Sequence, residues 1–397
     1  MADDDNFWWG VTSSSLRSEG VHPSADWSAW ERDGKAPLSD EGSGFGSEFR
    51  DDLGQLAALG LTHINVGLEW SRLEPEPGKI DRDEFNRYRD VLAAARHVGL
   101  QPIVTLQSQT LPGWFHIDMG GFRDDNARNQ VWTRHVDHCA EAFDGLVAGW
   151  IGVDDPIGWA IRGYLLGSRP PGRNDLEQAL GAVGDAMEAD RLAATILGSG
   201  QAPIISSFGL PPIFPVGVGA GPKARWWEHL FWDTWIGAIR DGELVVPELA
   251  PRQAHEYVDI YDIIGFSYSY PLGINLSGGF TPYPVEGDLD DTGLAPLPEE
   301  LGVACRRLAS ELPGKKLLIT GNGVTTNDDD WRDELLNQSL REIDSAVDDG
   351  VPLVGYFYDT GIDGYEGTRG FSTQRGLIGR DRNAKPSAER LNRHIIG

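Results

Sequence analysis

The chain has 397 residues, a formal net charge of −27 and a sequence pI near 4.6. A surface this acidic repels nucleic acids and anionic membranes, so we expect neither as a partner. The two cysteines, Cys139 and Cys305, lie far apart in helical patterns and form no disulfide framework. No apolar run approaches the ~18 residues of a membrane span, and the amino terminus lacks a basic segment followed by an apolar one. The sequence therefore predicts a cytoplasmic protein.

Short apolar runs alternate with amphipathic stretches along the whole chain. The runs predict eight strands, at residues 7–12, 62–69, 102–106, 150–153, 203–208, 261–268, 316–320 and 351–358. Helical periodicity follows them at 51–59, 85–95, 127–143, 176–197, 226–239, 298–308, 331–347 and 386–395. Eight strands that each precede a helix indicate a single (β/α)8 TIM barrel over residues 1–397. Segments 20–46, 210–224 and 272–298, which bear glycine and proline, follow predicted strands and are expected to be rim-loop insertions around a pocket.

Two aspartates end the fourth predicted strand. Residues 150–153 form the strand, and Pro156 removes a backbone donor, so the strand must stop at Asp154 and Asp155. In a barrel of parallel strands, this end lies at the rim where chemistry is done. Both aspartates are therefore candidate catalytic residues. The alternative is that they accept backbone N–H groups in the turn before a helix.

Five groups of motifs carry a resemblance to a known family. They are Phe7-Trp8-Trp9-Gly10 with Ser18-Glu19-Gly20, Glu69-Trp70-Ser71-Arg72, Asp155-Pro156, Ile319-Thr320-Gly321-Asn322-Gly323, and Gly355-Tyr356-Phe357 with Glu366. In this order the chain resembles the family-1 glycoside hydrolases over essentially its whole length. The resemblance implies a (β/α)8 barrel that hydrolyses β-glycosides with retention, using an acid/base glutamate after strand four and a nucleophilic glutamate after strand seven. That chemistry needs two carboxyl groups about 5 to 5.5 Å apart.

The resemblance also implies that both catalytic positions have changed. Asp155 matches the acid/base glutamate, Asp154 matches the asparagine before it, and Gly321 matches the nucleophile and has no side chain. The other changed sugar-binding positions are Arg17 for glutamine, Asn65 for arginine, Ser108 and Gln109 for histidine and tryptophan, Ser267 and Ser269 for asparagine and tyrosine, and Asp359 for tryptophan. Asp363 and Glu366 keep acidic positions. The expected substrate-binding residues are Arg17, Glu69, Ser108, Gln109, Ser267, Tyr268, Gly321, Asn322, Asp359, Asp363 and Glu366.

Three functions are compatible with these changes. In the first, the barrel acts on a glycoside or a related polar small molecule by non-standard chemistry, with Asp155 or Asp154 as acid/base and no covalent intermediate. An aspartate carboxyl retreats by roughly 1.5 Å relative to glutamate, which makes room for a water, and inverting hydrolysis needs carboxyls ~6.5 to 9.5 Å apart. The candidates for the second carboxylate are Glu69, Asp359 and Glu366. In this case, carboxylates that converge on one pocket raise the pKa of at least one of them, as a general acid requires.

The second function is ligand binding by a non-catalytic pseudo-glycosidase, because losing the nucleophile removes most of such an enzyme's rate. The third is an engineered, nucleophile-less variant of the glycosynthase type, in which Gly321 replaces the nucleophile. Arg17 follows the first strand, and a guanidinium that faces the pocket would suit an anionic ligand. No cofactor is implied. His135, His138 and Cys139 lie on a helix remote from the rim, so we predict no metal site there.

Overall fold

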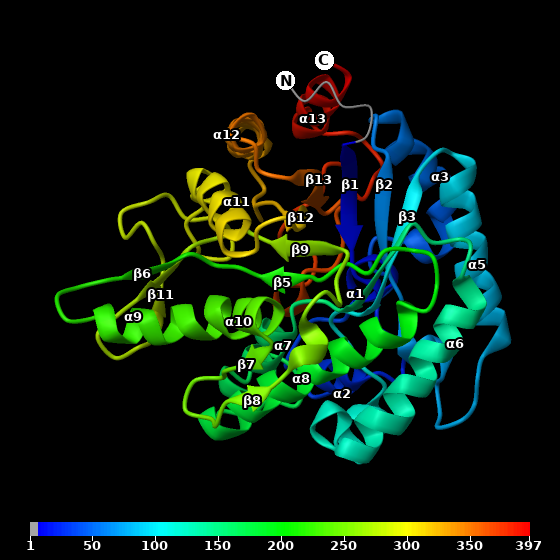
Figure 1. Cartoon of the computed structure of the whole chain (residues 1–397). Coiled ribbons are helices and arrows are strands. Elements are labelled where there is room, and N and C mark those ends of the chain that lie inside the picture. The colour runs from blue at the N-terminus through cyan, green and yellow to red at the C-terminus, as the bar shows by residue number, and fades with distance from the viewer. Residues whose placement is uncertain (1–6) are drawn as a thin grey trace.

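The computed structural model describes residues 7–397 and is built on eight parallel strands (Figure 1). Their hydrogen-bonded order is β4-β3-β2-β1-β13-β12-β9-β5. The bounds are β1 (Trp8–Ser13), β2 (His63–Gly67), β3 (Gln101–Gln107), β4 (Gly149–Val153), β5 (Phe208–Gly209), β9 (Ile263–Ser267), β12 (Lys316–Asn322) and β13 (Leu353–Asp359). Ile204 bridges Trp150 of β4, and Ile205 bridges Ile263 of β9, so the segment before β5 closes the sheet into a ring. The predicted (β/α)8 TIM barrel is confirmed.

The fifth strand is shorter than predicted. Instead of a continuous strand over 203–208, the chain makes single bridges at Ile204 and Ile205 and then the two-residue β5. The Ser206 hydroxyl explains the interruption, because it accepts the N–H of Gly265 at 2.9 Å and donates to the carbonyl of Gly265 at 3.0 Å. The carbonyl of Ser207 accepts instead from the backbone N–H of Asp155 at 2.7 Å. This break brings Ser207 to the carboxyl end of β4.

Helices cover the outside of the ring. The long ones are α3 (Phe45–Ala58), α5 (Arg82–His97), α6 (Thr133–Phe143), α8 (Leu176–Leu197), α10 (Thr234–Asp241), α11 (Glu299–Glu311), α12 (Asp329–Asp348) and α13 (Pro386–Ile396). Three of them begin at an aspartate, Asp81, Asp175 or Asp328, whose carboxylate accepts N–H groups of the first turn. The predicted helices 127–143 and 226–239 each contain a wider π-type turn, at Ala127–Trp132 and His229–Asp233. No helix of residues 7–397 is long and apolar enough to span a membrane.

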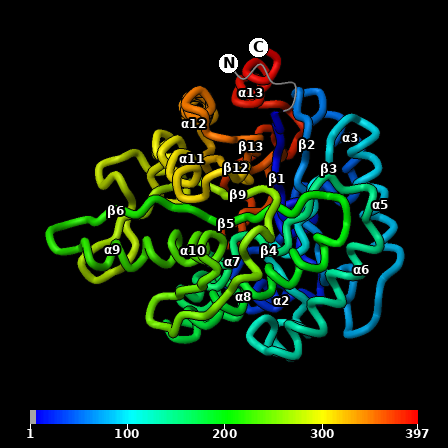
Figure 2. The backbone as a smooth tube through the Cα atoms, in the orientation of Figure 1, coloured from blue at the N-terminus to red at the C-terminus, as the bar shows by residue number. Residues whose placement is uncertain are grey.

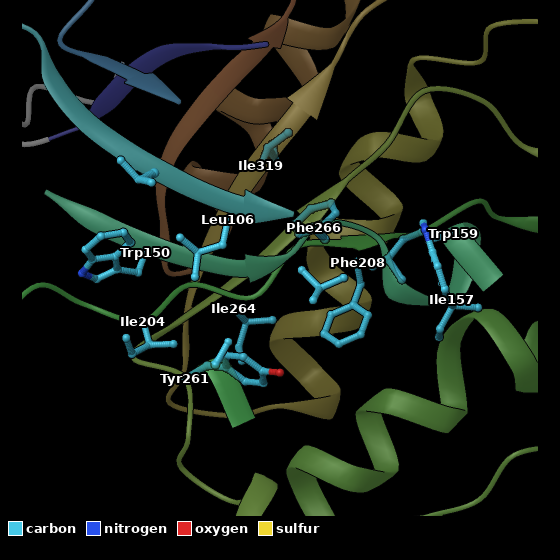
Figure 3. Packing of buried hydrophobic residues seen from close by; sticks show 14 of the residues in the cluster. Leu106, Trp150, Ile157, Trp159, Ile204, Phe208, Tyr261, Ile264, Phe266 and Ile319 are labelled. Atoms are coloured by element: carbon cyan, nitrogen blue, oxygen red, sulfur yellow. The ribbon is translucent and has the colours of Figure 1, made fainter. Parts of the chain in front are cut away.

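Two apolar layers hold the barrel together. The inner layer fills the ring with Ile103, Ile151, Ile205, Ile263, Leu318 and Phe357. Below it, the rings of Trp8 and His63 stack with centroids 4.5 Å apart. The outer layer, which includes Trp150, Ile204 and Ile264, lies between strands and helices (Figure 3). With its floor packed in this way, the barrel offers its chemistry at the rim formed by the carboxyl ends of the strands.

Two predicted rim-loop insertions pair with each other. β6 (Ile213–Pro215) comes from the first, and β10 (Leu272–Ile274) and β11 (Phe280–Thr281) come from the second, in the order β11-β10-β6. This small sheet extends with α9 (Gly221–Glu228) to one side of the barrel, as the backbone tube shows (Figure 2). The insertion at 20–46 contains α2 (Asp26–Arg32).

A buried aspartate joins α8 to β4. Asp190 is 1% exposed and accepts the N–H of Val153 at 2.8 Å and the hydroxyl of Tyr261 at 2.6 Å. Burial raises the pKa of Asp190 from 3.8 to about 6, because the two hydrogen bonds offset only part of the desolvation. The folded pKa therefore exceeds the unfolded one, and the neutral carboxyl's contribution to stability is lost as the pH rises through 6.

We expect Asp190→Asn to raise the free energy of unfolding at pH 8 by about 1–2 kcal/mol, since two pKa units are worth ~3 kcal/mol and one hydrogen bond is weakened. The gain should disappear as the pH falls and become a small loss near pH 4, where only the weakened hydrogen bond remains. Urea unfolding at pH 8, 6 and 4.5 measures it, with exposed Asp137→Asn as the control for removing one charge. A variant that is destabilised equally at all three pH values would contradict this assignment.

Candidate active site

Asp359, the last residue of β13, lies between two arginines. Nη1 of Arg17 is 2.5 Å from Oδ1 of Asp359, and Nε of Arg375 is 2.9 Å from Oδ2. Burial alone would raise the pKa of Asp359, but the two guanidinium groups outweigh it and hold the pKa below its usual value. The carboxylate of Asp359 therefore stays ionised at neutral pH.

Arg17 also binds Glu366 in the segment after β13. The distance from Nε of Arg17 to Oε1 of Glu366 is 2.9 Å. Ser14 caps the short helix α1 (Ser15–Glu19), which directs Arg17 over the rim just after β1. Burial raises the pKa of Glu366 against the pull of Arg17. Arg17 thus faces the predicted site, but its donor fork is already engaged by two carboxyl groups of the chain itself.

Both carboxylate oxygens of Asp155 bind other groups of the protein. It has a left-handed backbone (φ 48°) and caps α7 (Pro156–Ala160), with Oδ1 accepting the N–H of Gly158 at 3.0 Å. Oδ1 also accepts the N–H of Gly209 at 3.1 Å, and Oδ2 pairs with Nη1 of Arg162 at 2.9 Å. This is the backbone-accepting role that aspartates often take after a strand, and it falls on the residue that the motif resemblance matches to the acid/base position.

Asp154 is held differently. Its Oδ1 accepts the hydroxyl of Ser207 at 2.7 Å, and that hydroxyl lies 2.9 Å from the hydroxyl of Thr320 on β12. Burial, reinforced by the charge of Asp155, raises the pKa of Asp154 to about 6. Within residues 7–397 no arginine or lysine lies within ion-pair distance of it. The carboxyl group of Asp154 therefore exchanges its proton near pH 6.

Gly321 lies beside Asp359 and has room for a Cβ atom. A Cβ on Gly321 would lie 3.5 Å from Cβ of Ser267, 3.6 Å from Cγ2 of Thr12 and 3.7 Å from Cβ of Asp359. These are ordinary contact distances. No steric reason therefore requires glycine at this position, and Asp359 is the carboxylate that stands next to it.

Several predicted substrate-binding residues make contacts within the protein. Nδ2 of Asn322 donates to the carbonyl of Tyr268 at 2.8 Å, and its Oδ1 accepts the hydroxyl of Tyr356 at 2.9 Å. The Tyr268 hydroxyl donates to the carbonyl of Leu297 at 2.5 Å. Asn322 and Tyr268 therefore fix the segments after β9 and β12.

Asp363 and Glu69 are also engaged internally. Asp363 accepts the N–H groups of Arg375 and Gly376 and pairs with Nζ of Lys385 at 2.6 Å, so it orders the segment after β13. Glu69 is 0% exposed, and burial raises its pKa. Ser15 and Thr110 donate to one of its oxygens. Of the three candidates for the second carboxylate, Asp359 and Glu366 keep partly exposed side chains, whereas Glu69 is fully buried.

The remaining predicted residues lie at strand ends. Ser267 ends β9 beside Gly321, and Ser108 follows β3 and is 9% exposed. Oε1 of Gln109 accepts a hydrogen bond from Nη1 of Arg169 at 2.9 Å.

Four polar residues at the rim were missed from the sequence: Arg162, Arg169, Ser207 and Arg375. Ser207 directly precedes β5, Arg162 and Arg169 follow β4, and Arg375 follows β13. Their positions near strand ends were the only available signal. That signal does not distinguish a pocket residue from a surface residue.

The fold makes the chain a (β/α)8 barrel, with its candidate site at the carboxyl ends of the strands. It belongs to Glycosyl hydrolase family 1, whose model matches residues 4–201 and 288–395, and the resemblance seen in the motifs is confirmed. Beta-glucosidase A of Thermotoga maritima is 24% identical over 421 residues, covering 94% of this chain and 92% of the relative. A 1,4-beta-D-glucan glucohydrolase of Thermotoga neapolitana is 23% identical over 431 residues, covering 96% and 98%.

Among solved structures, the beta-glycosidase from Pyrococcus horikoshii superposes with a TM-score of 0.91 at 26% identity, covering 99% of this chain and 94% of that one. The family model leaves out residues 202–287. These residues hold the small sheet of β6, β10 and β11. They also hold the barrel strands β5 and β9, so the part of the chain outside the family model builds the side extension and one sector of the barrel.

Proposed function

We propose that this protein cleaves a β-glycoside without a covalent intermediate, with Asp154 as the general acid and Asp359 as the ionised carboxylate. The observation that carries the proposal is the divergence of the two pKa values, raised to about 6 for Asp154 and lowered for Asp359. Environments that push two carboxyl groups apart in this way assign one as acid and the other as base or charge stabiliser. Relatives named as β-glucosidases support the substrate class.

The absence of a side chain at Gly321 determines which group attacks the anomeric carbon. With no side chain at this position, no carboxylate there can bond to the anomeric carbon, so water is the attacking group. Asp359 is held by Arg17 and Arg375 and is a weak base, so its main contribution is negative charge that stabilises the oxocarbenium-like transition state. Asp154 gives its proton to the leaving oxygen as the glycosidic bond breaks, the water that bonds to the anomeric carbon releases a proton to bulk solvent, and solvent then restores the proton of Asp154.

Non-catalytic binding of a glycoside is the second candidate function. It is favoured by the ion pairs that Arg17 makes with Asp359 and Glu366. Through these ion pairs, two of the predicted substrate-binding acids already have a partner within the chain. The third candidate, an engineered loss of the nucleophile, is favoured by the ordinary contact distances that a Cβ on Gly321 would make. A single exchange does not account for the aspartate at 155 or the arginine at 17.

Release of p-nitrophenol from a panel of p-nitrophenyl β-glycosides, with and without azide or formate, separates the three candidates. We expect slow release without added anion and inverted configuration of the first sugar product by NMR. Release only with azide or formate would show that the site lacks just its nucleophile. No release under either condition, together with measurable glycoside binding, would establish the non-catalytic function.

A further inference from the structure

Arg169 lies where segments from four strand ends meet. It belongs to the segment after β4. Its Nη1 donates to Oε1 of Gln109 after β3 at 2.9 Å, and its guanidinium lies over the ring of Trp27 at 5.6 Å. Its Nη2 is 4.0 Å from the place of a Cβ on Gly367, in the segment after β13. Gln109 and Trp27 therefore hold this guanidinium over the rim, next to the cluster of Asp155, Arg17 and Glu366 that influences its charge.

Arg169 differs from the other rim arginines because it has no counter-ion. Arg17, Arg162 and Arg375 each pair with a carboxylate. In the described part of the chain, no carboxylate lies within 4 Å of Arg169, and Gln109 is its single hydrogen-bond acceptor. A guanidinium has five N–H donors in a planar fork that matches a carboxylate. An unpaired guanidinium is notable in a chain of net charge −27.

The charges around Arg169 favour a ligand that carries one negative charge. Arg17, Arg162, Arg169 and Arg375 face four carboxyl groups, those of Asp154, Asp155, Asp359 and Glu366. The four positive and four negative formal charges balance, and burial raises the pKa of two of the acids, Asp154 and Glu366. Burial, followed by repulsion from Arg162 and Arg17, lowers the pKa of Arg169 to about 9, so it still carries its charge at neutral pH. The rim is thus formally neutral within an acidic protein, and Arg169 is the arginine of this group that pairs with no carboxylate of the described residues.

We propose that Arg169, oriented by Gln109, binds a carboxylate on the glycoside. This inference rests on the proposed function for the identity of the ligand as a glycoside and adds its substrate class. Arg17 cannot take this role while Asp359 and Glu366 hold its fork. The carboxylate could belong to the sugar, as in a uronide, or to the leaving group.

Equilibrium binding to the full chain tests the proposal with two matched pairs of ligands. One pair is p-nitrophenyl β-glucuronide and p-nitrophenyl β-glucoside, and the other is 4-carboxyphenyl and 4-carbamoylphenyl β-glucoside. We expect the acid of one pair to bind roughly 10- to 100-fold more tightly than its neutral partner, as a charge-assisted hydrogen bond allows. The pair that shows the preference locates the carboxylate on the sugar or on the leaving group.

Three variants assign the preference. Arg169→Gln should abolish it, and Gln109→Glu should abolish it while keeping the arginine, because the new carboxylate supplies an internal counter-ion. Arg173→Gln, an exposed arginine of the same segment, should keep it. Thermal unfolding of each variant checks that it is folded.

The proposal is overturned if neither acid is preferred, if no glycoside of either pair binds, or if Arg169→Gln retains the preference. The binding measurement does not depend on turnover. If the protein prefers the acid but releases no product, the proposed hydrolysis is contradicted and this inference is kept. Cleavage of these glycosides without a preference for the acid would support the proposed hydrolysis and overturn this inference.

Discussion

Replacing Asp154 with asparagine is expected to lower kcat/KM for cellobiose roughly 10²- to 10⁴-fold, the usual contribution of a general acid. The same change should affect p-nitrophenyl β-glucoside far less, because p-nitrophenolate leaves without needing a proton. Asparagine keeps the size of the side chain and can still accept the hydrogen bond from Ser207. A loss that depends on the leaving group is therefore a signature of acid catalysis and not of disturbed structure.

The pH dependence of the activity tests the role of the Asp154 carboxyl group independently. Since the pKa of Asp154 is about 6, activity on cellobiose should fall as the pH rises above 6 and the acid loses its proton. The Asp154→Asn variant should lack this limb.

Asp155→Asn is the matched comparison. This neighbour caps α7 and pairs with Arg162, so its loss should lower stability by about 1 kcal/mol and act on both substrates alike. If Asp155→Asn shows the leaving-group dependence and Asp154→Asn does not, Asp155 is the acid.

The barrel could be predicted because its pattern is local. Apolar runs of strand length and helical stripes repeat eight times, and each can be recognised without knowing its neighbours. The fifth strand was the exception, since Ser206 uses its hydroxyl for bonds that the backbone would otherwise make with Gly265. The pairing of β6 with β10 was not foreseen either, because it joins two insertions far apart in the sequence.

The site could be predicted in position but not in chemistry. Motif order located Asp154, Asp155, Gly321 and Asp359 at the ends of their strands. Which of these carboxyl groups holds a proton depends on distances to arginines in other segments. Arg375 lies 16 residues after Asp359 and matches no motif, yet it helps to set the pKa of that aspartate. Such long-range pairs leave no trace in a single sequence.

Replacing Arg375 with methionine is expected to lower the free energy of unfolding by about 3–5 kcal/mol, the usual cost of leaving a buried ion pair with one partner. Nη1 of Arg375 donates to the hydroxyl of Thr325 at 2.9 Å, and Nη2 donates to that of Ser269 at 3.0 Å. Together with Asp359 these contacts join the segments after β9, β12 and β13. Urea unfolding measures the loss, and exposed Arg369→Met in the same region is the control.

Charge balance accounts for the size of this effect and supplies its decisive test. Arg375, Asp359, Arg17 and Glu366 form a chain of alternating charges with a formal sum of zero. Removing Arg375 leaves an excess negative charge, and adding Asp359→Asn restores the balance. The double variant should therefore be more stable than the sum of the two single losses predicts, by about 0.5–3 kcal/mol. Strict additivity would show that Arg375 acts through packing alone and that Asp359 does not need it to remain ionised.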